Sequence, residues 1–103
     1  MSLETMELHG DDVVRVAEAL SSATRFKMTR LLSKEKLDIS TIARRLGVSE
    51  AYASGEISQL EKLGIIKATY ARGKRGIRKV CELAVRRVIM NLTQGDEGAA
   101  QRT

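Results

Sequence analysis

Residues 39–66, ISTIARRLGVSEAYASGEISQLEKLGII, decide how this chain folds. Apolar residues recur at helical spacing on both sides of the short segment Gly47-Val48-Ser49. The two apolar stripes consist of Ile42, Ala43 and Leu46 before the segment and Ala53, Ile57 and Leu60 after it. Glycine suits a left-handed C-cap and serine an N-cap. The stretch therefore predicts two helices joined by a three-residue turn, with the second helix running from Ser49 to about Leu63.

Two further helices are expected upstream of this pair. Residues 11–22 begin with two aspartates, which suit a helix N-terminus, and continue with apolar residues at helical spacing. Ser22 is a candidate N-cap for a helix over residues 23–34. Between that helix and the pair, Ile39 is expected in a short strand and Ser40 as the cap of the helix over residues 41–46.

Downstream of Gly64 the period of the apolar residues changes from helical to alternating. Residues 65–71 and 77–82 alternate around the glycine-containing turn 72–76, which predicts a β-hairpin. A last helix is expected over residues 83–93, and the small and polar residues 94–103 predict a disordered tail. We expect residues 1–10 to be flexible, so that one domain covers residues 11–93.

The charge of the chain is concentrated in its second half. Residues 1–50 hold eight basic and eight acidic residues, so the formal net charge of +5 comes entirely from residues 51–103. Residues 67–87 contain eight basic residues and only one acidic residue, Glu82. A basic segment around a glycine turn favours contact with nucleic acid over a merely solvated surface.

Taken together, the stretches ALSSATRFKMTRLL, ISTIARRLGVSEAYASGEISQLEKLGII and YARGKRGIRKV resemble the ArsR-type winged helix-turn-helix transcriptional regulators. The resemblance covers roughly residues 13–82. It implies a mainly α fold with a small β-hairpin: a three-helix core, a wing and a C-terminal dimerisation helix. It also implies a homodimer on duplex DNA, with the helix after the turn in the major groove and the wing on the backbone or in a minor groove.

Residues on the outward side of the second helix are the candidates for reading DNA, because a helix fits the major groove and polar side chains can bond base edges or phosphates. They are Ser49, Glu50, Tyr52, Ser54, Gly55, Glu56, Ser58 and Gln59. The candidates for neutralising phosphates in the wing are Arg72, Lys74, Arg75, Arg78 and Lys79.

The centre of this helix departs from the family pattern. Relatives often carry a basic residue and a histidine where this chain has Gly55 and Glu56. An exposed Glu56 would repel phosphate, although it could accept a hydrogen bond from a cytosine amino group. We therefore expect modest affinity that comes mostly from the wing.

Neither a metal site nor a catalytic site is expected. The paired cysteines of metal-sensing relatives are missing, and His9 and Cys81 each stand alone. Cys81 is interpreted as a small core residue rather than a redox sensor. Without a long apolar run, a signal-peptide pattern or several cysteines, the chain is expected to act in the cytoplasm without a cofactor or a membrane.

The apolar stripe of the last expected helix predicts a homodimer interface together with the first helix. The residues are Val13, Val16, Leu20, Val85, Val88, Ile89 and Leu92. Two alternatives to DNA binding stay open: a winged helix that binds an acidic protein partner, and a winged helix that binds RNA.

Overall fold

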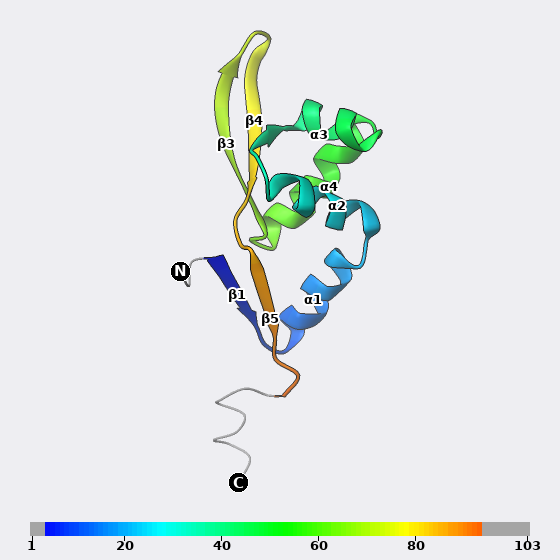
Figure 1. The fold of residues 1–103 in the computed structure, drawn as a ribbon, viewed down its shortest axis with the longest axis vertical. Coiled ribbons are helices and arrows are strands. Elements are labelled where there is room, and N and C mark those ends of the chain that lie inside the picture. Colours follow the sequence, from blue (N-terminus) through cyan, green and yellow to red (C-terminus); the bar gives the residue numbers. More distant parts are fainter. Residues whose placement is uncertain (1–3, 94–103) are drawn as a thin grey trace.

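The computed structural model describes residues 4–93. Four helices and five strands follow one another in this part of the chain, with the wing at one end and a small terminal sheet at the other (Figure 1). The elements are β1 (Thr5–Leu8), α1 (Asp11–Leu20), α2 (Ala23–Leu32), β2 (Leu37–Asp38), α3 (Ile39–Leu46), α4 (Glu50–Lys62), β3 (Ile66–Gly73), β4 (Gly76–Leu83) and β5 (Arg87–Met90).

The helix-turn-helix predicted from residues 39–66 is formed by α3 and α4, and local capping fixes both ends of its turn. Gly47 ends α3 in the left-handed conformation, with φ 70°. The Ser49 side chain caps α4 by accepting a hydrogen bond from the backbone N–H of Tyr52. Each cap satisfies backbone groups that a helix end leaves unpaired, which is why these sequence signals were sufficient.

The start of α3 differs from the expectation. Ile39 is the first residue of the helix rather than part of a strand, and the cap is Asp38 instead of Ser40. The carboxylate of Asp38 accepts a hydrogen bond from Thr41 N at 2.9 Å. Aspartate is as good an N-cap as serine, so the helix extends two residues further towards its N-terminus than expected.

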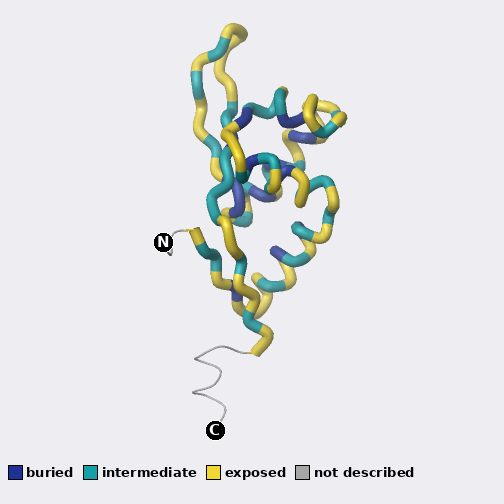
Figure 2. Tube along the Cα trace, in the orientation of Figure 1, coloured by how far each residue is buried: buried dark blue, intermediate teal, exposed yellow. Residues whose placement is uncertain are grey.

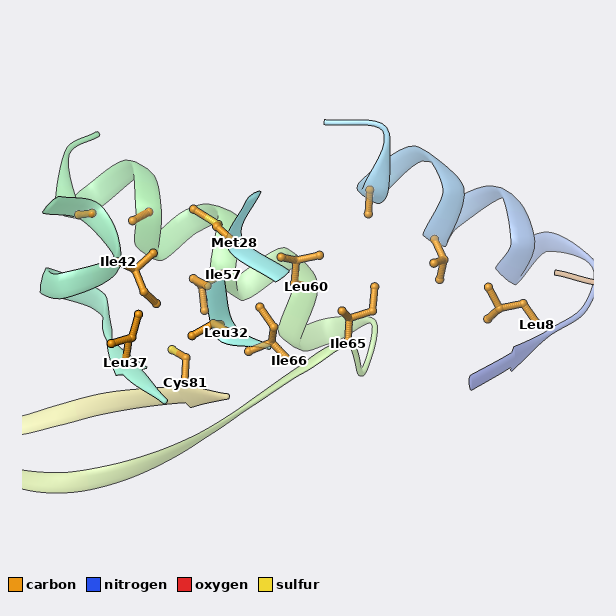
Figure 3. Packing of buried hydrophobic residues seen from close by; sticks show 14 residues of the cluster. Leu8, Met28, Leu32, Leu37, Ile42, Ile57, Leu60, Ile65, Ile66 and Cys81 are labelled. Atoms are coloured by element: carbon orange, nitrogen blue, oxygen red, sulfur yellow. The ribbon is translucent and has the colours of Figure 1, made fainter. Parts of the chain in front are cut away.

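The core lies where α2, α3 and α4 meet the base of the wing. Figure 3 shows side chains from these helices converging with Leu37 of β2 and Cys81 of β4. The fully buried large side chains are Met28, Ile42, Ile57, Leu60, Ile65, Ile66 and Cys81. Figure 2 shows that the outer half of the wing, by contrast, is largely exposed.

The wing is the antiparallel pair β3–β4. Its register runs from Ile66 opposite Leu83 to Gly73 opposite Gly76, so that Lys74 and Arg75 form a two-residue turn. Gly76 has φ 112°, which favours glycine. β2 extends the sheet by pairing antiparallel with β4.

The helix predicted over residues 83–93 is wrong. Residues Arg87–Met90 form the strand β5, which pairs in parallel with β1, and no helix occurs after α4 in the described residues. Val85, Val88 and Ile89 are β-branched and suit a pleated surface. Their spacing fits a helix equally well, so the outcome depends on the strand partner that β1 supplies.

The flexibility expected for residues 1–10 is therefore also wrong for Thr5–Leu8, which form β1. Leu8 is buried in the core cluster, and Met6 packs against that cluster. The expected disordered tail, residues 94–103, lies outside the described residues.

Candidate nucleic-acid interface

The α4 helix buries one side and exposes the other. Ala53, Ile57 and Leu60 are fully buried, as their spacing predicts. Six of the eight candidate reading residues are exposed: Ser49, Glu50, Tyr52, Ser54, Gly55 and Gln59. Ser58 is half-buried. A side chain placed at Gly55 would meet open space, because no atom lies within 4 Å of a Cβ built there.

Glu56 is not the exposed anion that the sequence suggested. Its carboxylate oxygen lies 2.9 Å from Nε of Arg25 on α2, and the side chains of Arg25 and Glu56 are 24% and 18% exposed. The Nε–H is not aligned for a hydrogen bond, so the contact is an ion pair between charges. Nη1 of Arg25 also donates to the carbonyl of Ala19 at the end of α1.

The charge of Glu56 is thus balanced inside the fold. Arg25 links three helices: it belongs to α2, donates a hydrogen bond to the end of α1 and forms an ion pair with α4. Partly buried charges need such a partner, because removing either one leaves the other poorly solvated. The sequence signal for this pair was weak, since 31 positions separate the two residues.

The wing cations fall into two groups, the first of which anchors the wing to the helices. Arg78 donates to Asp38 at 3.0 Å, and Lys79 donates to Glu61 near the end of α4 at 2.6 Å. The hydrogen bond to Glu61 raises the pKa of Lys79 above its usual value. The pKa of Asp38 is lowered, mainly by its hydrogen bonds with Thr41 and then by Arg78.

The second group carries its charge at the tip. Arg72, Lys74 and Arg75 are exposed, and within residues 4–93 none of them is in an ion pair. Together with Asp38 and Ser40, the tip borders a groove between the wing and the start of α3. Three of the five predicted wing residues are therefore available to a ligand without breaking an internal contact.

Sequence reasoning missed two exposed apolar residues on the wing. Tyr70 is 65% exposed and Ile77 is 77% exposed. Arg72 lies opposite Ile77, and Tyr70 lies two residues before Arg72 on the same strand, so the three share one face of the hairpin. Tyr70 and Ile77 lie on the same face of the hairpin as the buried Cys81, but further out than the core reaches. Strand alternation continued outward from Cys81 could therefore have indicated them.

The predicted dimer residues do not form one exposed stripe. Val16 is buried inside the monomer, while Val13, Leu20 and Val88 are half-buried and pack against the core. Val85 is half-buried, Ile89 is exposed, and Leu92 is 90% exposed. The prediction that Val16 contacts a second copy is wrong, because its side chain fills the core of one copy.

Cys81 is fully buried, and this burial raises the pKa of its thiol to about 11. The interpretation of Cys81 as a core residue is confirmed, since a sensing thiol needs exposure and a lowered pKa.

Within residues 4–93 no three His, Cys, Asp or Glu side chains lie close enough together to hold a metal ion. In the same range, no helix has the length and apolar character required to cross a bilayer.

Comparisons with known proteins agree with this geometry. Residues 22–68 match the family described as bacterial regulatory protein, arsR family. None of the curated proteins matches the chain.

Among solved structures, one is the homodimeric winged helix-turn-helix DNA-binding domain of a possible ArsR-family regulator from Mycobacterium bovis. It shares 27% identity at a TM-score of 0.63, over 72% of this chain and 65% of that one. An ArsR-like regulator from Rhodococcus sp. RHA1 shares 25% identity at a TM-score of 0.57, over 71% of this chain and 65% of that one.

A third structure, reduced HlyU from Vibrio cholerae, shares 16% identity at a TM-score of 0.62, over 72% of this chain and 74% of that one. The likeness to HlyU concerns the fold alone. The family match over residues 22–68 agrees with the resemblance to ArsR-type regulators that the sequence shows.

Proposed function

We propose that the chain regulates transcription as a homodimer that binds duplex DNA, with α4 in the major groove and the wing on the adjacent backbone or in a minor groove. One observation carries the proposal. The exposed side of α4 is mostly uncharged, and the three tip cations of the wing are in no ion pair within residues 4–93, so both surfaces can meet a ligand without breaking an ion pair described there. The Mycobacterium bovis relative, described as a homodimeric DNA-binding domain, supports the same assembly.

The two surfaces have different tasks in this proposal. Arg72, Lys74 and Arg75 contact phosphates, which gives affinity without sequence information. On α4, the polar side chains of Ser49, Tyr52, Ser54, Ser58 and Gln59 contact base edges or position the helix. Gly55 lets the helix backbone approach the groove closely.

Glu50, at the exposed start of α4, is the reading residue that can accept from a cytosine amino group. Glu56 acts from inside by holding α4 against α2 through Arg25. A two-fold dimer with reading helices about 34 Å apart would require a roughly palindromic site.

A second candidate is favoured by Tyr70 and Ile77. Exposed apolar side chains beside tip cations also suit an acidic protein partner with an apolar patch. Duplex DNA remains the first proposal, because α4 and the wing then take part together, whereas a protein partner of this kind would need only the wing.

The proposal is tested by the salt dependence of binding. If three tip cations per subunit meet phosphates, a dimer neutralises six. The slope of log K against log salt is then about −5, at about −0.9 per phosphate. The double variant Lys74→Ala/Arg75→Ala removes four of the six charges and should bring the slope to about −2.

The matched control is Lys27→Ala/Lys34→Ala, which removes the same charge from two exposed lysines in and after α2. Its slope should stay close to that of the unchanged protein. An equal loss of slope in both variants would show a general charge effect. No binding to duplex DNA at low salt, with binding to RNA or to acidic protein instead, would contradict the proposal.

A further inference from the structure

The terminal sheet is small for an independent structural element. It consists of the two four-residue strands β1 and β5, paired in parallel from Thr5 opposite Arg87 to Leu8 opposite Met90. It is separate from the wing sheet, as Figure 1 shows. Two-stranded sheets are marginally stable. Among residues 4–93 no further strand pairs with either edge, and an open edge presents backbone groups that can pair with another strand.

One face of this sheet is already covered. Met6, Leu8 and Val88 belong to the core or pack against it. Because side chains alternate along a strand, Glu7 and Ile89 are on the opposite face, and both are exposed. What remains for a partner is therefore this outer face and the two edges.

The surroundings of the two edges differ in polarity. The groove beside β1 is mixed: the charged residues Glu7, Asp12, Arg15 and Lys62 line it together with Gln59 and the apolar residues Met6, Leu8, Val16 and Leu63. The cleft on the β5 side is mostly apolar: six of its ten lining residues are Leu20, Phe26, Ile65, Leu83, Val85 and Val88, and the others are Thr29, Arg30, Ser33 and Arg86. An apolar cleft that continues into an open strand edge suits a partner that supplies both a strand and apolar side chains.

The β5 side also carries the apolar side chains that such a partner would bury. Ile89 is 45% exposed, Met90 39%, and Leu92 90%. Phe26, at the cleft, is 47% exposed. These side chains gather at the strand whose edge is open, so the same segment has unpaired backbone and unburied apolar surface.

We infer that the occupant is a second copy of this chain, whose β5 pairs antiparallel with the first β5 across a two-fold axis. The pairing gives a continuous four-stranded sheet. It places Ile89 of the two copies side by side on the outer face, and it brings Met90, which shares the face of Val88, and Leu92 towards the partner's apolar cleft. It rests on the proposed homodimer and specifies how that dimer is built. The interface is isologous, because the same residues contribute from both copies.

The charges along β5 agree with antiparallel self-pairing. With Ile89 near the axis, Arg87 of one copy lies opposite Asn91 of the other, and Arg86 lies opposite Leu92. The two arginine pairs are thus kept apart, whereas a parallel arrangement would bring them together. Like charges directly opposite each other destabilise a sheet, so orientation follows from charge.

The inference is tested by sedimentation at micromolar concentration. The unchanged chain should be a dimer, and Ile89→Lys a monomer, because two lysines would face each other at the axis. The control His9→Lys adds the same charge at an exposed position directly after β1 and should remain a dimer. A monomeric unchanged chain, or a dimeric Ile89→Lys, would overturn the inference.

Crosslinking gives a second measurement if Ile89→Lys fails to fold. Ile89→Cys should form covalent dimers with a short thiol-reactive linker. Glu7→Cys should not, since three strand spacings, about 14 Å, would separate its two copies. Buried Cys81 leaves a low background. Crosslinking of Glu7→Cys but not Ile89→Cys would reject the β5 edge, as would no crosslinking of either variant.

The two proposals can fail separately. A monomer that still binds duplex DNA would overturn this interface and leave the DNA-binding proposal intact. A dimer that passes both interface tests but binds no DNA would support this interface and overturn the DNA-binding proposal.

Discussion

The wing joins β3 to β4 through two residues, whereas the terminal sheet joins β1 to β5 across almost the whole chain. The wing closes locally, and its base is held by the ion pairs Arg78–Asp38 and Lys79–Glu61. At the terminal sheet, the ion pair between Arg86 and Glu4 is longer, 3.8 Å, and more exposed. Bringing two such distant segments together costs loop-closure entropy unless the chain between them is already folded, so the terminal sheet depends on the rest of the fold.

This difference predicts that the terminal sheet can open while the helical core stays folded. The core, in contrast, should not unfold while the terminal sheet stays paired. Leu60→Ala, in the core, should lower the free energy of unfolding by about 2–5 kcal/mol. Leu8→Ala removes a buried side chain from β1 and should chiefly release the terminal sheet.

Denaturant unfolding and amide hydrogen exchange would measure both variants. In Leu8→Ala, exchange should rise in β1 and β5 while α3 and α4 stay protected. Faster exchange throughout the molecule in Leu8→Ala would mean that the two regions unfold as one unit.

The same contrast explains which parts of the fold could be predicted from the sequence. Ser22, Ser49, Gly47 and Gly64 act on their own neighbours, so the helices α2, α3 and α4 and their turns followed from local rules. The partner of β5 lies about eighty residues away, and Val85, Val88 and Ile89 fit a helical period as well as a strand. Nothing local distinguishes the two.

The candidate interface divides in the same way. The exposed side of α4 and the basic tip followed from periodicity and charge. The pairing of Glu56 with Arg25 and of Lys79 with Glu61 did not, because each joins elements whose relative placement only the folded chain defines. An acid on a helix surface looks exposed in sequence whether or not a neighbouring helix brings it a cation.

A second prediction concerns the anchored base of the wing. The folded pKa of Asp38 lies below its unfolded value, so its ionised form contributes stability above about pH 4 that is lost as pH falls through the folded pKa. Asp38→Asn keeps an N-cap acceptor for Thr41 but loses the ion pair with Arg78. At pH 7 the variant should be less stable by about 0.5–1 kcal/mol.

Unfolding by denaturant across pH would check this prediction. The difference between the unchanged chain and Asp38→Asn should shrink below about pH 4 and vanish once Asp38 is protonated. A difference that persists in acid would assign the effect to the geometry of the cap. In neither case should the terminal sheet respond, because Asp38 contacts the wing and α3.

The smallest expected effects come from two neighbours on α4. Gly55→Arg places a cation in open space on the exposed side of the helix, and arginine favours a helix over glycine by about 0.5–1 kcal/mol. Under the proposed function this variant should bind arbitrary duplex DNA more tightly at fixed salt and unfold at a slightly higher temperature. Glu56→Gln also adds one unit of positive charge, but it leaves partly buried Arg25 without its carboxylate. It should lower stability without tightening binding.

Titrating unrelated duplexes with both variants, alongside thermal unfolding, separates charge from position. Simple attraction between charges predicts equal gains in affinity, because both variants change the net charge by the same amount. A gain for Gly55→Arg alone would mean that the side of α4 carrying residue 55 is presented to DNA, while residue 56 serves the packing of α4 on α2. No gain for Gly55→Arg would count against major-groove docking of this helix and favour a protein partner for the wing.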